Sequence, residues 1–186
     1  MIGSLTRFVE GQLKLVVNRA KSKAAPLRQC AFLGFQIGAV GKAVWTAKAY
    51  ARFKQRVREI TRRNRGHCVQ DIIDELHRYV VGWLNYFGIS HTYTALLELA
   101  EWVRRRVRLY YWKQWKRPRT RRYHLLELGA DPEEVHMATR SRKGFWRMSS
   151  NSIVQRALTN RWLHEQGVPD LRSLWIVLHY GPKARV

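Results

Sequence analysis

Two short groups of carboxylates are the places where acidic side chains are close enough in the sequence to hold a metal ion. The groups are Asp71, Asp74 and Glu75, and Asp131, Glu133 and Glu134. Polymerases and nucleases use such carboxylates to hold the ions that stabilise the attacking and leaving oxygens. Here the first group falls on the polar side of a predicted helix and the second at a helix start, where the helix dipole favours negative charge. We therefore interpret both groups as structural and predict no metal site.

The other residue types that could perform catalysis lack a catalytic context. The seven histidines include no HExxH motif, and Ser22, Ser149 and Ser152 lack the glycines of a nucleophile elbow. No glycine-rich loop for phosphate binding is present. Cys30 and Cys68 form no CxxC pair, which favours a reduced chain with two small, buried cysteines. We therefore expect no catalysis by this chain alone.

A basic segment that is also rich in aromatic residues occupies residues 102–122. It contains ten Lys and Arg residues, three tryptophans and no Asp or Glu. Helical periodicity places an apolar stripe on one side, and the opposite side then carries Arg104, Arg105, Arg108, Trp112, Trp115 and Lys116. Cations neutralise phosphates and an indole can stack on an unpaired base, so we predict that this face binds nucleic acid. The alternative is that both tryptophans pack against a following helix while the arginines are merely solvated.

The overall charge also favours a polyanionic partner. With 35 Lys and Arg against 13 Asp and Glu, the formal net charge is +22, which attracts nucleic acid first and an anionic membrane surface second. The chain has no run of about 20 apolar residues, so we expect no membrane span. A second basic run beside Phe145 and Trp146 consists of Arg140, Arg142, Lys143 and Arg147. We predict an RNA or DNA track in a groove between the two basic regions.

Most of the chain has the hydrophobic periodicity of α-helices. The strongest pattern spans residues 69–87, and further helices are predicted over residues 5–16, 50–60 and 94–116, with shorter ones after Pro118. Residues 32–46 alternate around Gly38 and Gly41, which predicts two short strands joined by a turn. The sequence thus predicts a mainly α fold, a helical bundle preceded by one β-hairpin.

Several motifs, in order, resemble the C-terminal part of a group II intron-encoded reverse transcriptase, or maturase. "LKLVVNRAKSK" is similar to the family's segment after the catalytic strands, and "FLGFQI" to its primer-supporting hairpin. The motifs similar to the family's thumb, also called domain X, are "GWLNYF", "WVRRRVRLYYWKQWK", "LLELG", "RKGFWRMS", "ALTNRWLHEQGVPDL" and "HYGP". The resemblance covers nearly the whole chain. It implies a palm remnant over residues 1–46 and a helical thumb over residues 47–186.

The resemblance implies a chain that binds folded group II intron RNA, promotes its splicing and grips an RNA/DNA template-primer duplex. The residues similar to the primer-supporting region are Lys21, Lys23, Phe32, Leu33, Gly34 and Phe35. From the resemblance and the charge pattern together, we predict RNA contacts at Arg104, Arg105, Arg106, Arg108, Trp112, Lys113, Trp115, Lys116, Arg117, Arg119, Arg121, Arg122, Arg140, Arg142, Lys143 and Arg147.

The family's Tyr-Ala-Asp-Asp metal-binding box does not occur in this sequence, nor do the Cys and His elements of its DNA endonuclease domain. We therefore expect no cofactor in this chain, with Mg²⁺ needed only by the missing palm and by the RNA itself. A second hypothesis is that the chain is one piece of a split RNA-directed DNA polymerase whose fingers and palm come from another polypeptide. A third is a degenerate fragment without function. The expected location is the bacterial cytoplasm or nucleoid, with no membrane partner.

Overall fold

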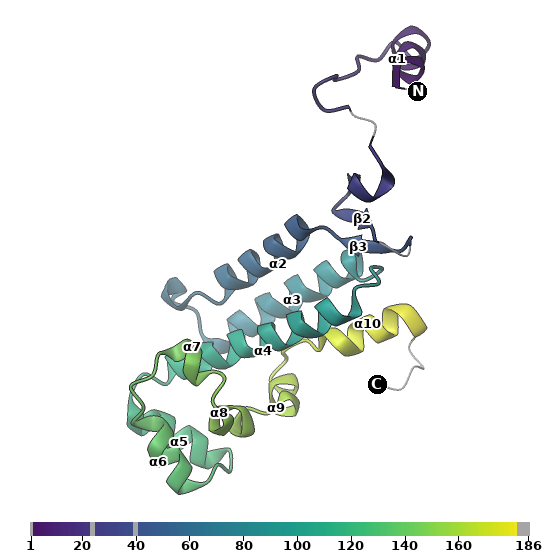
Figure 1. The fold of residues 1–186 in the computed structure, drawn as a ribbon. Coiled ribbons are helices and arrows are strands. Elements are labelled where there is room, and N and C mark those ends of the chain that lie inside the picture. The colour runs from purple at the N-terminus through teal and green to yellow at the C-terminus, as the bar shows by residue number, and fades with distance from the viewer. Residues whose placement is uncertain (1, 23–24, 39–40, 182–186) are drawn as a thin grey trace.

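The computed structural model describes residues 2–22, 25–38 and 41–181, and over these ranges the chain is mainly helical (Figure 1). The helices are α1 (Ile2–Gly11), α2 (Ala47–Ile60), α3 (Val69–Phe87), α4 (Tyr93–Gln114), α5 (Pro118–Glu127), α6 (Pro132–Thr139), α7 (Phe145–Met148), α8 (Ser152–Ala157), α9 (Asn160–Glu165) and α10 (Leu171–Tyr180), with short 3-10 turns η1 (Leu27–Gln29) and η2 (Arg63–Arg65). The strands are β1 (Ala31–Phe32), β2 (Phe35–Ile37) and β3 (Ala43–Trp45). The predicted fold class, mainly α after a β-hairpin, is confirmed.

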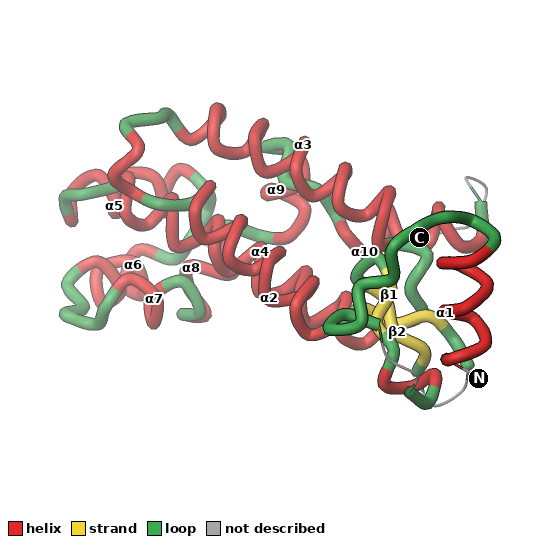
Figure 2. The backbone as a smooth tube through the Cα atoms, turned by 90° about the horizontal axis from the view of Figure 1, so that it is seen from above, coloured by secondary structure: helices red, strands yellow, loops and turns green. Residues whose placement is uncertain are grey.

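The body of the molecule is formed by α2, α3 and α4, which lie side by side, and α10 packs against α3 and α4 (Figures 1 and 2). Each helix turns a stripe of apolar side chains toward its neighbours. Phe53 on α2, Leu76 on α3 and Leu99 on α4 are all fully buried between them. The helix predicted over residues 69–87 coincides with α3.

A cluster of aromatic rings fixes the small sheet to one end of this bundle. The ring of Trp45, on β3, lies 5.0 Å from that of Trp83 on α3, which in turn lies 4.6 Å from Phe53. The indole N–H of Trp45 also donates a hydrogen bond to the carbonyl oxygen of Phe87 at 2.9 Å. The hydrogen bond satisfies the polar atom of a buried tryptophan, so the sheet and the end of α3 form one packed unit.

The sheet contains one more strand than the sequence predicted. Its order is β1-β2-β3, antiparallel throughout, with Phe32 opposite Phe35 and Phe35 opposite Trp45. The additional strand arises because Leu33 and Gly34 both have positive φ, 51° and 83°, as in a two-residue type I′ hairpin turn. Leucine rarely adopts this conformation, so the sequence gave little sign of the turn.

The N-terminal helix is shorter than predicted. Its apolar pattern continues to Val16, but α1 ends at Gly11, and Leu13 and Val16 lie beyond it with exposed side chains. Glycine is a poor helix former, and Lys14 has a positive φ of 52° that no helix allows.

One residue of each acidic group caps a helix. Asp71 and Cys68 form a capping box at the start of α3, where the Sγ of Cys68 accepts from the backbone N–H of Asp71 at 3.4 Å. Asp131 caps α6 by accepting from the backbone N–H of Glu133. Within the described ranges, no group of three or more His, Cys, Asp or Glu residues could hold a metal ion. The prediction that both cysteines are buried was wrong, because Cys68 is an exposed cap and Cys30 is half-buried.

Candidate nucleic-acid interface

The predicted basic face of α4 is not a surface at its C-terminal half. Trp112 is 1% exposed, Trp115 8% and Arg108 7%, so the prediction that they share a solvent-facing side was wrong. The apolar stripe through Val107 is buried as well. Both sides of α4 are covered, one by the bundle and the other by the segment from α5 to α9. The alternative interpretation, in which the tryptophans pack against a following helix, is the correct one for this pair.

The packing around these tryptophans is aromatic. The ring of Trp115 stacks on His124 of α5 with 4.8 Å between centroids, and Trp112 lies edge-on to Trp115 at 6.4 Å. The neighbouring Tyr111 contacts Trp162 of α9 at 5.1 Å, and burial raises the pKa of its phenol to about 12. These residues are therefore part of the core and are not available to stack on RNA bases.

Arg106 and Arg108 are also structural. The guanidinium of Arg106 donates to the buried hydroxyl of Thr61 at 2.6 and 3.0 Å. Burial, followed by the charge of Arg58, lowers its pKa. Arg108 donates to the carbonyl oxygen of Leu158 at 2.9 Å. Burial, with a smaller contribution from Arg104, lowers the pKa of Arg108 to about 10, which leaves it charged at neutral pH.

Arg105 and Arg121 hold α5 and α7 against α4. The guanidinium of Arg105 lies 3.9 Å from the ring centre of Trp146 and donates to that residue's carbonyl oxygen at 3.1 Å. Arg121 donates to the carbonyl oxygen of Trp115 at 2.8 Å and lies 4.7 Å from the ring of Trp112. Burial lowers the pKa of Arg121. Cation–π contacts and carbonyl acceptors thus replace carboxylates as the partners of these arginines.

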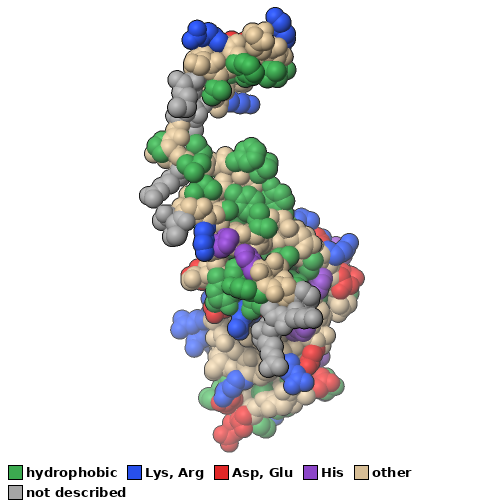
Figure 3. All heavy atoms as spheres, turned by 90° about the vertical axis from the view of Figure 1, so that its right-hand side faces the viewer, with side chains coloured by type: hydrophobic (Ala, Val, Ile, Leu, Met, Phe, Trp, Pro, Cys, Tyr) green, Lys and Arg blue, Asp and Glu red, His purple; other side chains and the backbone are tan. Residues whose placement is uncertain are grey.

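The residues that resemble a primer-supporting region lie at the opposite end of the bundle from α5 and α6 (Figure 1). Phe32 and Leu33, at the hairpin tip, are 77% and 65% exposed, whereas Phe35 packs 5.2 Å from the ring of Phe87. Lys21 is exposed, and Lys23 lies outside the described residues. Figure 3, which faces this end, shows hydrophobic side chains gathered on its surface. A cavity of about 650 Å³ opens beside the hairpin and is lined by Leu33, Gly34, Lys48, Arg52, Trp83 and Tyr86, among others.

The other predicted cations form an exposed basic surface around the end of α4, the start of α5 and the loop before α7. We call it the basic end. Its exposed members are Lys116, Arg117, Arg119, Arg122, Arg140, Arg142, Lys143 and Arg147. The described parts of the chain provide no carboxylate within 4.0 Å of any of them, whereas Arg56, Arg156 and Arg161 elsewhere are each paired with a glutamate. Arg104, which is half-buried, lines a separate small cavity between α4 and α9.

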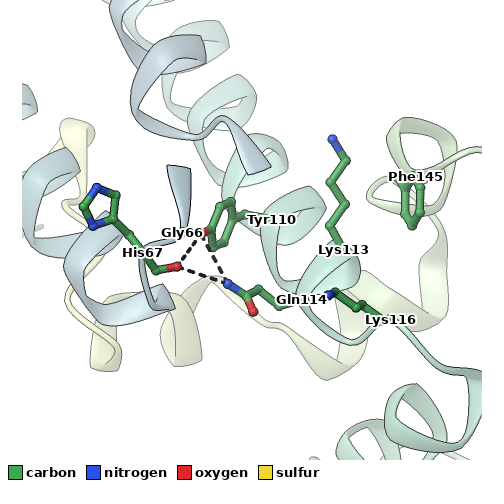
Figure 4. A pocket seen from close by; sticks show the side chains of 7 residues that line it. All are labelled: Gly66, His67, Tyr110, Lys113, Gln114, Lys116 and Phe145. Atoms are coloured by element: carbon green, nitrogen blue, oxygen red, sulfur yellow. Dashed lines mark hydrogen bonds between the residues drawn. The ribbon is translucent and has the colours of Figure 1, made fainter. Parts of the chain in front are cut away.

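A cavity of about 560 Å³ lies at the basic end, where the C-terminus of α4 meets the start of α7 and the loop before α3 (Figure 4). It is lined by Gly66, His67, Tyr110, Lys113, Gln114, Lys116 and Phe145. The ammonium of Lys113 lies 5.7 Å from the ring centre of Phe145. The end of α4 therefore contributes lysines to this cavity, whereas the second basic run contributes only the neighbouring Phe145.

Sequence reasoning assigned no binding role to His67, Tyr110 or Gln114, although they line this cavity. Tyr110 was expected in the core and is buried, and its hydroxyl donates to the carbonyl oxygen of His67 at 3.0 Å. His67 precedes α3 by two residues and is brought to α4 by the turn at Gly66, which has a φ of 72°. No local pattern could have indicated a contact between segments 43 residues apart.

Residues 50–128 match the family model of the group II intron, maturase-specific domain. The matched range runs from α2 through α5 and includes most residues that line the cavity at the basic end. A search of curated proteins found no match. In the described ranges, no helix is both long and apolar enough to cross a membrane. The chain therefore carries the maturase-specific domain of group II introns over residues 50–128, consistent with the C-terminal thumb region of a group II intron reverse transcriptase.

Proposed function

We propose that the chain is an RNA-binding maturase module that recognises folded group II intron RNA through its basic end. The observation that carries this proposal is the set of exposed cations without carboxylate partners on the described surface, in a chain whose residues 50–128 match the maturase-specific domain. On a passive surface, cations and anions are interspersed. Folded RNA presents a dense array of phosphates that such a surface neutralises, with release of counterions.

Such a module promotes splicing without bond chemistry of its own. If it binds the active fold of the intron more tightly than inactive folds, binding shifts the RNA population toward the active fold. The chemical step and the Mg²⁺ ions it needs then belong to the RNA. The same basic end can contact the backbone of a template-primer duplex, since both ligands offer phosphates at regular spacing.

The test is the salt dependence of binding to a group II intron RNA. If six to ten phosphates are contacted, affinity falls by about 10³ to 10⁵ between 50 and 200 mM salt. Replacing Lys116, Arg119 and Arg122 together with Ala should reduce the slope of log affinity against log salt by about 2 to 3.

The matched control removes the same charge from cations that already have partners. Arg56, Arg156 and Arg161 pair with Glu59, Glu134 and Glu165, so their joint replacement with Ala removes three equally basic side chains outside the basic end. We expect little change in the salt slope. Equal effects of the two triple variants would show that binding depends on net charge alone and that the basic end is not the interface.

A second candidate function rests on the exposed hairpin tip. Phe32 and Leu33 present apolar side chains to solvent beside an apolar cavity, a feature typical of a surface that contacts another protein. In the split-polymerase hypothesis this tip contacts a palm supplied by a second polypeptide. The test is primer extension with Mg²⁺ after the chain is mixed with a maturase palm and fingers polypeptide. Activity that requires both chains and is lost in Phe32→Ser supports this function.

A further inference from the structure

We propose that the cavity at the basic end binds one unpaired nucleotide of the RNA partner. This proposal rests on the proposed function and specifies which part of the RNA the cavity binds. The cavity volume of about 560 Å³ lies within the range of small-molecule sites in proteins. It is partly open to solvent. Its lining residues come from the C-terminal part of α4, the start of α7 and the loop before α3 (Figure 4).

One wall of the cavity can stack on a base. Phe145 lines it and is half-buried, with the guanidinium of Arg121 5.5 Å from its ring centre. The ammonium of Lys113 lies 5.7 Å from the same ring centre. Because every base has a flat π-face, an aromatic side chain can stack on any unpaired base regardless of its identity. Trp112 and Trp115 cannot do this, since they are buried, so Phe145 takes the role that the sequence suggested for them.

The polar wall of the cavity has a fixed arrangement of donors and acceptors. A carbonyl oxygen can only accept, so the hydroxyl of Tyr110 donates to His67 at 3.0 Å and its own oxygen is left as an acceptor. The atom of the Gln114 side-chain amide that lies 3.2 Å from this hydroxyl and 3.5 Å from the His67 carbonyl must then be Nε2. This orientation leaves Oε1 of Gln114 as an acceptor for a base N–H group.

The cations around the cavity favour a nucleotide within a strand over a free one. Lys113 and Lys116 line the cavity, where they can neutralise the phosphate of the bound nucleotide. The exposed Arg117 follows the lining residue Lys116 directly, the exposed Lys143 lies two residues before Phe145, and both can contact the phosphates on either side. No carboxylate lines the cavity among the described residues.

The test uses three RNA hairpins of the same stem sequence. The first carries a single unpaired 2-aminopurine nucleotide, the second an abasic site at that position, and the third is fully paired. Wild-type protein should bind the first about 5- to 150-fold more tightly than the second, the range expected for stacking of one base. Binding should also change the 2-aminopurine fluorescence, which is sensitive to stacking.

Phe145→Leu is the variant that isolates the stacking contact, because it keeps an apolar side chain for packing and removes the aromatic ring. It should reduce the preference for 2-aminopurine over the abasic site to about one while binding the paired hairpin like wild type. Tyr123→Leu is the matched control, since Tyr123 is an aromatic residue of α5 that is 62% exposed and does not line the cavity. The Tyr123→Leu variant should keep the wild-type preference for 2-aminopurine over the abasic site. A thermal melt of each variant confirms that it is folded.

Each result decides between the two proposals. If group II intron RNA shows no salt-dependent binding, the proposed function fails and the nucleotide site falls with it. If the paired hairpin binds but wild type shows no preference for the unpaired base, or Phe145→Leu retains that preference, only the nucleotide site is overturned. Loss of the preference in Tyr123→Leu also overturns it. If 2-aminopurine nucleoside monophosphate binds as tightly as the hairpin, the ligand is a free nucleotide and the assignment to RNA is wrong.

Discussion

The guanidinium of Arg108 joins α4 to Leu158, which follows α8, and to Asn160 at the start of α9. Its Nε donates to the carbonyl oxygen of Leu158 at 2.9 Å, and its Nη2 donates to Oδ1 of Asn160 at 2.8 Å. Hydrogen bonds from a charged donor are stronger than those between neutral groups, and the carbonyl oxygen of Leu158 has little access to water here. Arg108 is therefore part of the fold.

The first prediction concerns Arg108→Met, which keeps much of the apolar stem and removes both hydrogen bonds. The free energy of unfolding should fall by about 2 to 4 kcal/mol, because a buried carbonyl loses its partner. Arg104→Met, on the same helix but half-buried, should change it by less than about 0.5 kcal/mol. Urea denaturation of both variants measures the difference, and equal destabilisation would contradict the structural role of Arg108.

The long helices could be predicted because their packing is regular. In α3, residues such as Ile73, Leu76, Val80 and Leu84 face one way and are buried, so hydrophobic periodicity alone locates the helix. The small sheet was harder to predict. Its first turn depends on Leu33 in a conformation that leucine rarely adopts, and the packing of Gly34 against Phe87 stabilises that turn only in the folded protein.

The interface could be predicted only in part, because a helical wheel assumes that each helix has one buried face. The second half of α4 is covered on both sides, so Trp112, Trp115 and Arg108 are buried although they lie opposite the apolar stripe. The density of aromatic residues there was the available sign, since aromatic side chains dominate cores. The acceptors that make an arginine structural, such as the Leu158 carbonyl, lie about fifty residues away and cannot be read from local sequence.

A second prediction concerns Gly34 in the hairpin turn. A Cβ at this position would lie 2.9 Å from Cε1 of Phe87, and the φ of 83° is unfavourable for any residue with a Cβ. Gly34→Ala should therefore lower the free energy of unfolding by about 2 to 4 kcal/mol.

Gly41→Ala is its control. Gly41 also has a positive φ, 72°, but among the described residues no heavy atom other than those of Gly41 and its chain neighbours lies within 4 Å of an added Cβ. This variant should cost only about 1 kcal/mol, the contribution of the backbone conformation alone. Chemical denaturation of both proteins tests whether the excess in Gly34→Ala arises from Phe87. Similar losses would mean that the close approach of the glycine to that ring is unimportant.

A third prediction is a pH dependence at the start of α3. Hydrogen bonding to the side chain of Cys68, and then to its backbone N–H, lowers the pKa of Asp71 below its ordinary value of 3.8. Because the pKa is lower in the folded state, the stability contributed by ionised Asp71 is fully present above pH 3.8 and is lost as the pH falls through the folded-state pKa.

The Cys68→Ala variant tests this linkage. It removes the side-chain partner, so an NMR titration should find the pKa of the Asp71 carboxyl closer to 3.8 than in wild type. Cys68→Ser restores a side chain that can cap the helix and should keep the pKa low. An unchanged Asp71 pKa in Cys68→Ala would exclude the cysteine side chain as its main cause.

The last prediction separates folding from RNA binding within two adjacent residues of α5. Arg121 donates to the carbonyl oxygen of Trp115 and lies over the ring of Trp112, whereas Arg122 is exposed. Arg121→Ala should lower the free energy of unfolding by about 1 to 2 kcal/mol, through loss of the hydrogen bond and the cation–π contact. Arg122→Ala should leave stability unchanged and reduce the salt slope of RNA binding by about 1, because it removes one phosphate contact. Thermal denaturation of both variants should show a loss of stability in Arg121→Ala alone, and salt-dependent RNA binding should show a reduced slope in Arg122→Ala alone. If Arg121→Ala instead kept full stability but bound RNA more weakly, Arg121 would belong to the interface.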